Sequence, residues 1–358
     1  TVAEENDAEQ AKTAGNLEVH FIDVGQGDAT LIKCDGHSML IDAGNNDKGT
    51  LVQNYLQHQG VETLDYVIGT HPDADHIGGM DVVLYKFDCK TIIMPDVANN
   101  TRTYDDVVQT MKNKGYKTTY PVVGETYTIG GAAFTIIAPN KEYGNDMNSW
   151  SVGVLLQNGN HRFLFTGDAE EGAEQDILQN GIDISADVYK VAHHGSNTAT
   201  SQAFLDAVHP TYAVISAGEG NSYGHPHAEV LNRLRAAGVS VFRTDEQGTI
   251  VASSDGTTLT WNMSPSESWQ AGEAKKSQNT EKSEKAADSQ NNAETDAAIS
   301  NPTDQTDGNS DVIVHITKTG EKYHSAGCQY LRKSDIEVTL SEAKARGLTP
   351  CSKCNPPQ

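Results

Sequence analysis

The sequence predicts an α/β fold in which two β-sheets pack face to face and helices cover their outer surfaces, an αββα sandwich. Between residues 17 and 263, apolar segments of strand length alternate with segments of helical periodicity. The strand patterns dominate both halves of this region, and the helical patterns are spaced so that they can cover outer faces. A chain of 358 residues with 37% hydrophobic residues has room for about two domains and can bury a sizeable core.

Each expected element follows from a local pattern. Strands are expected where apolar residues cluster over strand length, as in LEVHFID and ATLIK, which flank the turn GQGD. Helices are expected where apolar residues recur at helical spacing, and the first such segment stops at Gly60. The expected strands are 17–23, 29–33, 38–42, 65–69, 132–138, 151–157, 161–167, 187–192 and 212–218. The expected helices are 48–59, 102–114, 170–179, 201–207 and 228–237.

The charge of the chain argues against some functions. The formal net charge is −23, and the region 17–263 alone holds 14 basic and 31 acidic residues, a net charge of −17. This balance argues against a protein that coats nucleic acid by bulk charge. Any attraction for a polyanion must therefore be local within 17–263 or come from the tail 311–358. No apolar run reaches the roughly 18–20 residues of a membrane span, so we expect no span in this chain.

Two segments have compositions that disfavour folding. Residues 264–310 consist mostly of Ser, Asn, Asp, Glu, Lys and Ala, and we expect a disordered tether. Residues 1–16 are polar and acidic, and we expect a disordered stub left after a signal or lipid-anchor segment was removed. Together with the scarcity of cysteine in the main region, these features favour an extracellular or surface-attached protein.

The last segment, 311–358, is expected to be a small separate module. It has a strand pattern over 312–317, a helix pattern over 340–346 and a net charge of +2. A module of this size buries little apolar surface and needs an additional constraint. We interpret four of its residues as a structural zinc site of the zinc-ribbon type, with a disulfide and a spare thiol as the alternative. These residues are His324, Cys328, Cys351 and Cys354.

The strongest chemical signal is the segment THPDADHIGG, which directly follows an expected strand. His71, Asp73, Asp75 and His76 fall within six residues of a strand-to-helix turn. Such a turn can direct the first two side chains one way and the last two another, so one loop can serve two metal ions. Imidazole and carboxylate ligands suit Zn, Mn or Fe. The alternative is an ordinary polar turn with an N-capping aspartate.

Further ligand types follow the ends of later strands. Asp168 follows FLFTG, His193 and His194 follow YKVA, and His225 and His227 lie in a Gly/Pro turn before a helix. A single aspartate or histidine in such a place is usually structural. Because such residues recur at successive strand ends, we predict one joint metal site.

Several of these segments resemble a known superfamily. HPDADHIGG, LIDAG, TGD and AHHGS resemble the metallo-β-lactamase superfamily, and FIDVGQGDATLI, KVAHHGSNTATSQAFL and NSYGHPHAEVLNRL are similar to the hydrolase domain of ComEC-like competence proteins. The resemblance covers about 17–263 and implies an exported metal-dependent hydrolase with that superfamily's αββα fold. The C-terminal segment more distantly resembles small Ada-type Cys/His metal-binding modules.

The resemblance also implies a set of metal ligands. His71 and Asp73 would bind a first metal ion, and Asp75 and His76 a second. Asp168 would bridge the two ions. His194 would complete the second site, with its neighbour His193 as the less favoured candidate. Asp42 would orient a ligand from behind, and Asn148 would be a weak ligand of the first ion.

The residues and the resemblance together suggest a phosphodiesterase, and within that class a nuclease that acts on DNA. Three carboxylates beside three imidazoles favour Mn²⁺, with Zn²⁺ as the alternative. Two such ions, roughly 3.5–4 Å apart, can share a bridging hydroxide as the nucleophile. Asp75 and His225 are the expected catalytic residues, and His225 and Ser196 the expected phosphate contacts.

Other functions stay open at this point. The acidic balance of 17–263 favours a small or local substrate, so hydrolysis of phosphocholine on cell-wall polymers is the main alternative to DNA. A β-lactam hydrolase or a binding protein with a degenerate site is less consistent with the motifs. The oligomeric state does not follow from the sequence.

Overall fold

The computed structural model describes residues 14–273, together with 313–317, 322–324, 331, 336–345, 348–351 and 353–354 near the C-terminus. The chain forms two compact units, residues 1–283 and 284–358, and each is considered by itself. Most of the predicted N-terminal stub and of the predicted tether therefore lies outside the described residues. Among the described helices, none is long and apolar enough for a transmembrane span.

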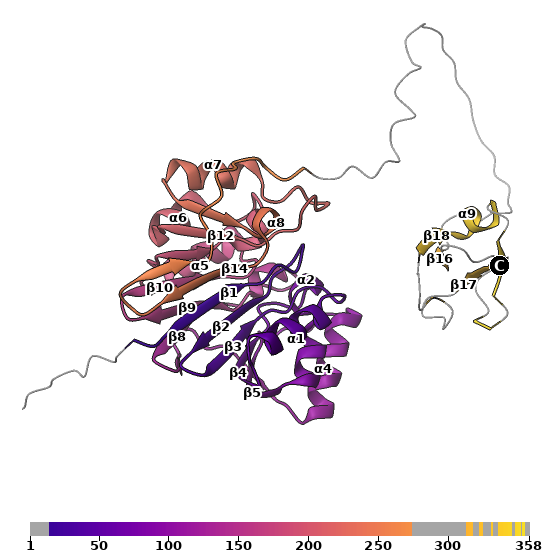
Figure 1. Cartoon of the computed structure of the whole chain (residues 1–358), viewed down its shortest axis with the longest axis horizontal. Helices are drawn as coiled ribbons and strands as arrows, with labels where there is room; N and C mark the ends of the chain where they lie inside the picture. Colours follow the sequence, from indigo (N-terminus) through magenta and orange to yellow (C-terminus); the bar gives the residue numbers. More distant parts are fainter. Residues whose placement is uncertain are drawn as a thin grey trace, which may run out of the picture. The chain divides into compact units, whose positions relative to one another are not determined.

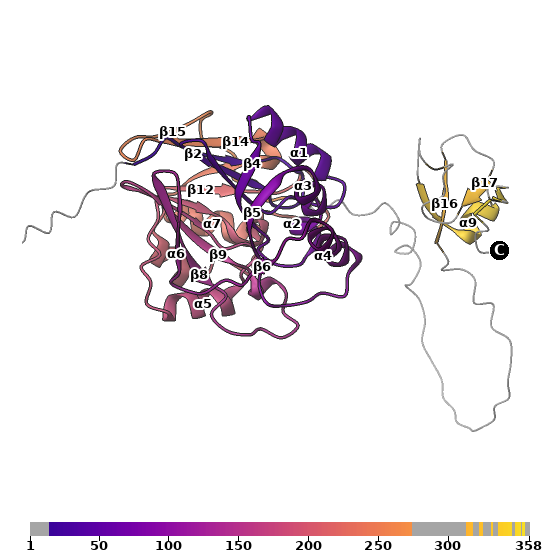
Figure 2. The same cartoon turned by 90° about the horizontal axis from the view of Figure 1, so that it is seen from below.

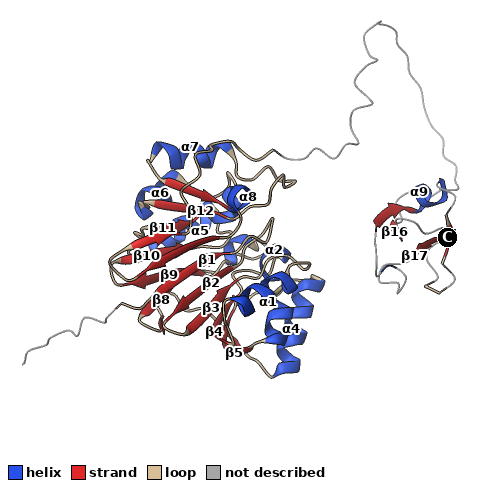
Figure 3. Cartoon of the chain, in the orientation of Figure 1, coloured by secondary structure: helices blue, strands red, loops and turns tan. Residues whose placement is uncertain are grey.

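Two mixed sheets form the centre of the larger unit (Figures 1 and 3). The first sheet contains β1 (Leu17–Phe21), β2 (Thr30–Cys34), β3 (His37–Ile41), β4 (Thr63–Ile68), β5 (Asp88–Ile93), β6 (Thr118–Thr119), β14 (Ile250–Ser254) and β15 (Leu259–Trp261). Its order is β15-β14-β1-β2-β3-β4-β5-β6. The second sheet contains β7 (Thr126–Ile129), β8 (Ala132–Ala138), β9 (Gly153–Asn158), β10 (His161–Phe165), β11 (Val188–Lys190), β12 (Tyr212–Ile215) and β13 (Ser240–Arg243). Its order is β13-β12-β11-β10-β9-β8-β7.

Helices cover the outer face of each sheet, as Figure 2 shows. The first sheet is covered by α1 (Gly49–His58), α3 (Met80–Lys86) and α4 (Arg102–Lys114), which share an apolar cluster with its strands. The second sheet is covered by α5 (Glu171–Gln179), α6 (Gln202–Val208) and α7 (Ala228–Ala236), which share another. The predicted αββα sandwich is confirmed.

Residues of the central strands pack alternately on opposite sides. In β10, Phe163 and Phe165 join the cluster between the two sheets, whereas Leu164 joins the cluster under the outer helices. Met39 and Leu40 of β3 divide in the same way. Because these strands are buried on both faces, they appear in the sequence as continuous apolar runs, which are easily recognised.

Some elements do not coincide with the predicted ones. The predicted helix at 102–114 has the same bounds in the structure. The sequence analysis did not identify β5, β6, β7, β13, β14, β15 or α3. Several of these are short or mix exposed polar residues with buried ones, as in DCKTII of β5, so their local signal is weak.

Residues 264–273, here called the strap, pack on the larger unit although we expected them to belong to the tether. The Gly272 N–H donates to the Pro226 carbonyl at 2.9 Å. Trp269 packs against the apolar cluster under the outer helices, and its ring centroid lies 4.7 Å from the Arg235 guanidinium. The polar composition of 264–310 did not reveal these contacts because they depend on one tryptophan and on main-chain groups.

The smaller unit contains a four-stranded sheet. Its order is β18-β16-β17-β19, from β16 (Ile313–Ile316), β17 (Lys322–His324), β18 (Ile336–Thr339) and β19 (Thr349–Pro350). The helix α9 (Leu340–Ala345) follows β18. Side chains of these elements, including Val314, Tyr323 and Leu340, form a small apolar cluster. The predicted strand and helix of this module are both present, within one residue at each end.

Candidate metal centre

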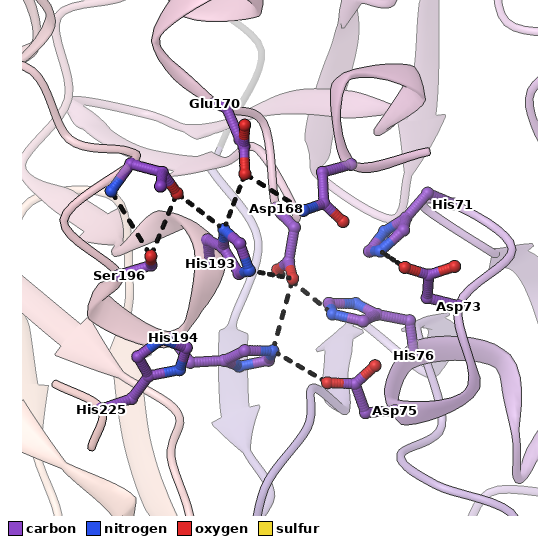
Figure 4. A network of polar contacts seen from close by, with 12 residues as sticks. His71, Asp73, Asp75, His76, Asp168, Glu170, His193, His194, Ser196 and His225 are labelled. Atoms are coloured by element: carbon purple, nitrogen blue, oxygen red, sulfur yellow. Dashed lines mark hydrogen bonds and ion pairs between the residues drawn. The ribbon is translucent and has the colours of Figure 1, made fainter. Parts of the chain in front are cut away.

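The candidate metal centre lies where loops of the two sheets meet (Figure 4). Within the first sheet β3 and β4 run parallel, and the loops after them carry Asp42 and residues 71–76. Within the second sheet β10, β11 and β12 run parallel, and the loops after them carry Asp168, residues 193–194 and His225. Because carboxyl ends of parallel strands meet at one edge of a sheet, side chains far apart in sequence lie together.

The loop that holds residues 71–76 is fastened to the glycine-rich turn after β1. The Asp28 N–H donates to the Asp75 carbonyl at 3.0 Å. Gly27 has a φ of +137°, and a β-carbon there would lie 2.4 Å from the same carbonyl oxygen. Only glycine permits this approach, so the turn positions the loop through main-chain contact.

Two buried histidines are oriented from behind. Nδ1 of His76 donates to the Asp42 carboxylate at 2.8 Å, and Nδ1 of His194 donates to the Ser216 carbonyl at 3.0 Å. Each bond holds a ring proton on Nδ1, so that Nε2 is directed into the centre and can offer a lone pair to a cation when it releases its own proton. Metal-binding histidines are oriented in this way by partners of their other nitrogen. The predicted role of Asp42, to orient a metal ligand, stays a prediction.

His71 resembles these two histidines, because its contacts are at Nδ1 and its Nε2 has no hydrogen-bond partner. The atoms that meet at the centre are of types that bind metal ions. Nδ1 of His71 lies 3.1 Å from the Thr70 hydroxyl and 3.4 Å from the Ser151 hydroxyl. Buried polar atoms rarely lack a hydrogen-bond partner. Imidazole nitrogen and carboxylate oxygen both bind divalent cations, so the absence of protein partners fits a centre that holds such ions. In the part of the chain that the structure describes, the atoms without a partner include Nε2 of His71, His76 and His194 and Oδ1 of Asp168.

Asp168 lies between two of these histidines. Its Oδ1 is 3.1 Å from Nε2 of His76, and its Oδ2 is 3.4 Å from Nε2 of His194. Its main-chain N–H donates to the Ser151 hydroxyl at 3.0 Å, which fixes the start of this loop. A carboxylate with one oxygen toward each side is well placed to bridge two cations.

Two further carboxylates lie beside different histidines. Oδ2 of Asp75 is 3.3 Å from Nε2 of His194, and Oδ2 of Asp73 is 3.7 Å from Nε2 of His71. The side chain of Asp73 is 39% exposed against 27% for Asp75. The Asn99 amide donates to the other Asp73 oxygen at 3.4 Å. The half of the centre around His71 and Asp73 is therefore the more open one.

The electrostatics of the centre favour positive charge. Burial by itself lowers the pKa of His76 and of His194, but the carboxylate of Asp168 and a second carboxylate beside each ring raise both pKa values well above the usual one. Burial by itself raises the pKa of Asp168, but the two imidazoles hold it well below its usual range. By contrast, burial and the nearby His76 lower the pKa of His71 to about 3. The buried carboxylates thus stabilise positive charge, whether it comes from protons or from cations.

Backbone strain also gathers at this place. Asp42, His193 and His194 have φ values of 57°, 49° and 53°, in the left-handed region that residues with a β-carbon disfavour. Each such residue costs of the order of 1–2 kcal/mol. Strain of this kind persists where the surrounding structure imposes it, and it is frequent at functional sites.

The two adjacent histidines differ in their surroundings. The His194 side chain is 1% exposed and contacts both Asp75 and Asp168. The His193 side chain is 20% exposed, with Nε2 3.7 Å from Asp168 and Nδ1 3.4 Å from Glu170. The geometry favours His194 as the ligand and places His193 beside the bridge, at the edge of the centre.

Two further predicted residues, Asn148 and Ser196, differ in their position relative to the cavity. Asn148, at the start of the 3-10 helix η1 (Asn148–Trp150), faces the cavity, and its amide donates to Glu170 at 3.2 Å. The Ser196 hydroxyl is 3.0 Å from that of Thr198, and Ser196 is not among the residues that line the cavity. The phosphate contact predicted for Ser196 stays a prediction.

A cavity of about 170 Å³ opens on the candidate centre. His225 lies at its rim, 5% exposed, in the turn before α7. The lining residues come from loops of both sheets. They are Gln26, Asp73, Asp75, Asn148, Asp168, His193, His194, Tyr223 and His225.

From the sequence, Asp28 is expected to hold a loop in place, whereas Glu170 is not selected at all. Asp28 lies behind His194, with Oδ1 3.5 Å from Nδ1, and its other oxygen accepts from the buried Lys190 ammonium at 2.8 Å. These contacts fit an orienting role better than that of a ligand. Glu170 lies between His193 and Asn148. Its only local signal is its position two residues after Asp168, which is too weak to identify it.

The smaller unit contains a second group of ligand types. Ligand atoms of His324, Cys351 and Cys354 all lie within 4.8 Å of one another. Sγ of Cys354 is 3.7 Å from Nδ1 of His324. Tetrahedral zinc with ordinary Zn–S and Zn–N distances separates two such atoms by about 3.6 Å, so the described residues fit a zinc ion. Cys328 lies outside the described residues.

Comparison with known proteins agrees with this fold and centre. A family model described as the metallo-beta-lactamase superfamily matches residues 22–219, and the chain belongs to that superfamily. It is a hydrolase of a fold that binds divalent metal ions and whose members are usually metal-dependent.

Its curated relatives include larger proteins. ComE operon protein 3 of Bacillus subtilis is 31% identical over 255 residues, which cover 65% of this chain and 32% of that protein. Recombination protein 2 of Haemophilus influenzae is 33% identical over 238 residues, which cover 65% and 28%. Competence protein ComA of Neisseria gonorrhoeae is 29% identical over 230 residues, which cover 64% and 31%. The chain thus spans less than a third of the length of these relatives.

Solved structures with similar folds are more distant in sequence. The metallo-beta-lactamase fold protein YhfI of Bacillus subtilis is 13% identical, with a TM-score of 0.46 over 69% of this chain and 99% of that one. CmlA, a diiron beta-hydroxylase of Streptomyces venezuelae, is 12% identical, with a TM-score of 0.43 over 64% and 52%.

Proposed function

We propose that the protein is a metal-dependent phosphodiesterase that cleaves DNA with two divalent metal ions. The observation that carries the proposal is the position of Asp168, whose two carboxylate oxygens lie 3.1 Å from Nε2 of His76 and 3.4 Å from Nε2 of His194. Two relatives are named for recombination and for competence, processes in which DNA is handled. Because the chain covers only part of those proteins, the substrate belongs to the proposal.

The side chains divide into two groups of ligands. His71 and Asp73 would hold one ion, and Asp75, His76 and His194 the other, with Asp168 shared. The second group is more buried and contains one more imidazole, so we expect its ion to bind more tightly. The ligand chemistry supports Mn²⁺ or Zn²⁺. Such ions lower the pKa of a water molecule and offset charge on phosphoryl oxygens.

His225 is placed to contact the substrate as a neutral hydrogen-bond donor. The Gly218 N–H donates to Oε1 of Gln26 at 3.3 Å, which fixes the orientation of that amide. The amide nitrogen of Gln26 then faces Nδ1 of His225 at 3.5 Å and donates to it, so the ring proton lies on Nε2. Burial and the neighbouring His194 lower the pKa of His225 to about 4. A neutral donor suits a contact with a phosphate oxygen better than proton transfer to a leaving group.

A direct assay tests the proposal. The purified protein is incubated with single- and double-stranded DNA, with bis(p-nitrophenyl) phosphate and with a chromogenic β-lactam, each with Mn²⁺, Zn²⁺ or a chelator. We expect DNA cleavage that requires a divalent ion and is lost in Asp75→Ala and Asp168→Asn. Asp65→Asn is the control, because Asp65 contacts Lys90 and His37 at a distance from the centre.

The outcomes separate the candidate functions. Cleavage of the chromogenic diester without loss of DNA would contradict the choice of substrate but not the phosphodiesterase chemistry. Turnover of the β-lactam alone, or no turnover at all, would contradict the proposal as a whole.

The acidic surface favours a second candidate substrate. Among the described residues that line the cavity there is no lysine or arginine, and residues 17–263 carry a net charge of −17. Phosphocholine esters of cell-wall polymers carry a cationic group that such a surface attracts. Hydrolysis of p-nitrophenyl phosphorylcholine that far exceeds the hydrolysis of DNA would support this alternative.

We also propose that the smaller unit binds a structural zinc ion through His324, Cys351 and Cys354, with Cys328 as the fourth ligand. Metal analysis of the full chain treated with mild chelator should leave one tightly held zinc ion. Cys351→Ser should abolish it. A thiol titration that finds a disulfide instead would contradict the proposal.

A further inference from the structure

An exposed tyrosine lies at the mouth of the candidate centre. Tyr223 lines the cavity although it is 63% exposed. Its ring is nearly parallel to the imidazole of His225, with 16° between the planes and 5.5 Å between the centroids. Among the described residues, His225 is the one aromatic ring that contacts Tyr223, and most of the tyrosine side chain stays exposed. Tyr85 and Tyr120 are similarly exposed, but neither lines the cavity.

The turn that carries Tyr223 is firmly held. Oδ1 of Asn221 accepts from the N–H groups of Tyr223 and His225, both at 3.0 Å. Nδ2 of Asn221 donates to the carbonyls of Gly218, at 3.0 Å, and His225, at 2.7 Å. The strap adds the bond from Gly272 described above. The backbone is therefore fixed while the tyrosine side chain stays largely exposed, which is the preorganisation that a ligand contact requires.

The size of the cavity indicates what this ring contacts. Ligand pockets for whole small molecules have about 300–1,000 Å³, so about 170 Å³ holds a phosphate group but leaves an attached nucleoside at the rim. Tyr223 occupies that rim. Proteins that bind single-stranded nucleic acid commonly stack bases on aromatic side chains, and this attraction needs no positive charge on the protein.

We propose that Tyr223 is the stacking platform for the nucleobase next to the cleaved phosphate, which makes an unpaired strand the substrate. This inference rests on the proposed phosphodiesterase function. A trimethylammonium group is the competing occupant, but such groups are bound by cages of several aromatic rings. Among the described residues that line the cavity, Tyr223 is the only tyrosine, phenylalanine or tryptophan.

Dinucleotides with a single phosphodiester test the proposal. The wild-type chain, Tyr223→Ala, Tyr223→Phe and the control Tyr85→Ala are compared on thymidine dinucleotide and on analogues in which one base is replaced by hydrogen. Tyr85 is a matched control because it is 64% exposed and lies in α3, outside the residues that line the cavity. We expect Tyr223→Ala to lower kcat/KM about 5- to 150-fold on the intact substrate, the range that stacking of one base implies. Tyr223→Phe and Tyr85→Ala should stay within about twofold of wild type.

The analogues distinguish stacking from a structural role. On the analogue that lacks the stacked base, wild type should already be slower, and Tyr223→Ala should change the rate less than about twofold. An equal loss on intact and base-free substrates would overturn the proposal, because it would show that Tyr223 only supports His225. Faster cleavage of phosphorylcholine esters that depends on Tyr223 would overturn it in favour of a cationic substrate.

A binding measurement keeps the inference separate from the catalytic proposal. A phosphorothioate-linked oligonucleotide that contains 2-aminopurine is added in the presence of Mn²⁺, and fluorescence quenching by stacking is recorded. Quenching by wild type and Tyr223→Phe but not by Tyr223→Ala supports the stacking platform, whether or not the protein cleaves any substrate. A failure to cleave any substrate would contradict only the proposed function. Equal quenching by all variants would contradict the platform.

Discussion

At the scale of single residues, the candidate centre depends on partners that face away from it. Asp42 holds Nδ1 of His76, and the Ser216 carbonyl holds Nδ1 of His194. Each bond selects one tautomer and stops rotation of the ring. The centre is therefore built by groups that would touch neither metal nor substrate, and its affinity depends on them.

Substitution of Asp42 tests this dependence. Asparagine tolerates the left-handed backbone at this position, so Asp42→Asn should fold. Its amide no longer provides a full carboxylate for Nδ1 of His76, and we expect metal affinity to fall about 10- to 100-fold. Calorimetric titration with Mn²⁺ or Zn²⁺ measures this, with Asp65→Asn as the control. Unchanged affinity in Asp42→Asn would show that His76 is not a ligand.

The stabilising effect of metal should depend on pH. Without metal, the pKa values of His76 and His194 in the folded protein lie above 6.5, the usual pKa of histidine. These two histidines therefore contribute their full stabilisation below pH 6.5. That stabilisation is lost as the pH rises through their raised pKa values. The pKa of Asp168 is lowered instead, so its contribution to stability depends on pH in the opposite direction. That contribution is lost only as the pH falls below 3.8, the usual pKa of aspartate.

We therefore expect the chelator-treated protein to melt at a lower temperature at about pH 8 than at about pH 6, and metal to raise Tm more at the higher pH. At a hundredfold excess over Kd the rise should be roughly 5–10 °C. Asp168→Asn removes the carboxylate that raises both pKa values and should flatten the pH dependence. A metal-induced shift that is larger at the lower pH would contradict this account.

Some residues of the centre were predictable and others were not. His71, Asp73, Asp75 and His76 stand in one short motif of ligand types after a strand, so their grouping was visible in the sequence. Their roles as ligands stay predictions. Glu170 and Gln26 could not be selected, since each acts through a partner from another loop. Tyr223 lies in a turn where tyrosine is unremarkable, and only its place at the cavity gives it meaning.

At the scale of elements, the strap connects the end of the domain to the rim of the cavity. Gly272 lies against the main chain of His225, where a β-carbon would stand 2.2 Å from the carbonyl oxygen, and its N–H donates to Pro226. The Arg243 guanidinium donates to the Gln270 carbonyl at 2.6 Å. The strap therefore supports the turn that presents His225.

Truncation should reveal this support. A chain that ends at residue 273 should keep the Tm and activity of the larger unit, whereas one that ends at residue 263 loses the strap. We expect the shorter chain to lose about 1–3 kcal/mol of stability, from the exposed apolar surface and the lost hydrogen bond between Arg243 and the Gln270 carbonyl, and to hydrolyse substrate more slowly. Trp269→Ala in the full chain should lower Tm in the same direction. Equal thermal melting and activity of both truncated chains would show that the strap has no structural role.

Predictability of the elements follows their burial. Strands that are buried on both faces, such as β3 and β10, have continuous apolar runs and were identified. The pairing of strands could not be predicted from local sequence patterns, because β1 pairs with β14, which lies more than two hundred residues later in the chain. The position of β14 depends on contacts across the whole domain and could only be found in the folded structure.

At the scale of the whole molecule, the excess of acidic groups limits how a polyanion can bind. Residues 17–263 carry a net charge of −17, and the buried Lys190 is already paired with Asp28. Within this region we therefore expect attraction to come from the ions of the centre and from stacking rather than from a basic surface. Export from the cytoplasm, which the composition favours, stays a prediction.

Binding of single-stranded DNA should therefore depend weakly on salt. With one or two phosphates neutralised, the slope of log K against log salt at fixed metal concentration should be about −0.7 to −1.4. Fluorescence anisotropy of a short labelled strand measures it. A slope steeper than about −4 would require six or more phosphate contacts and would point to a cationic surface that this account does not contain.

The ligand-type side chains come from both halves of the sandwich, residues 71–76 from one and residues 168 and 194 from the other. An ion held among them would join distant segments as a reversible cross-link, and separating the halves would require its release. Where divalent ions are scarce, the empty protein would open more often and offer proteases more sites. The supply of one ion would then govern both how fast the enzyme works and how long each molecule survives.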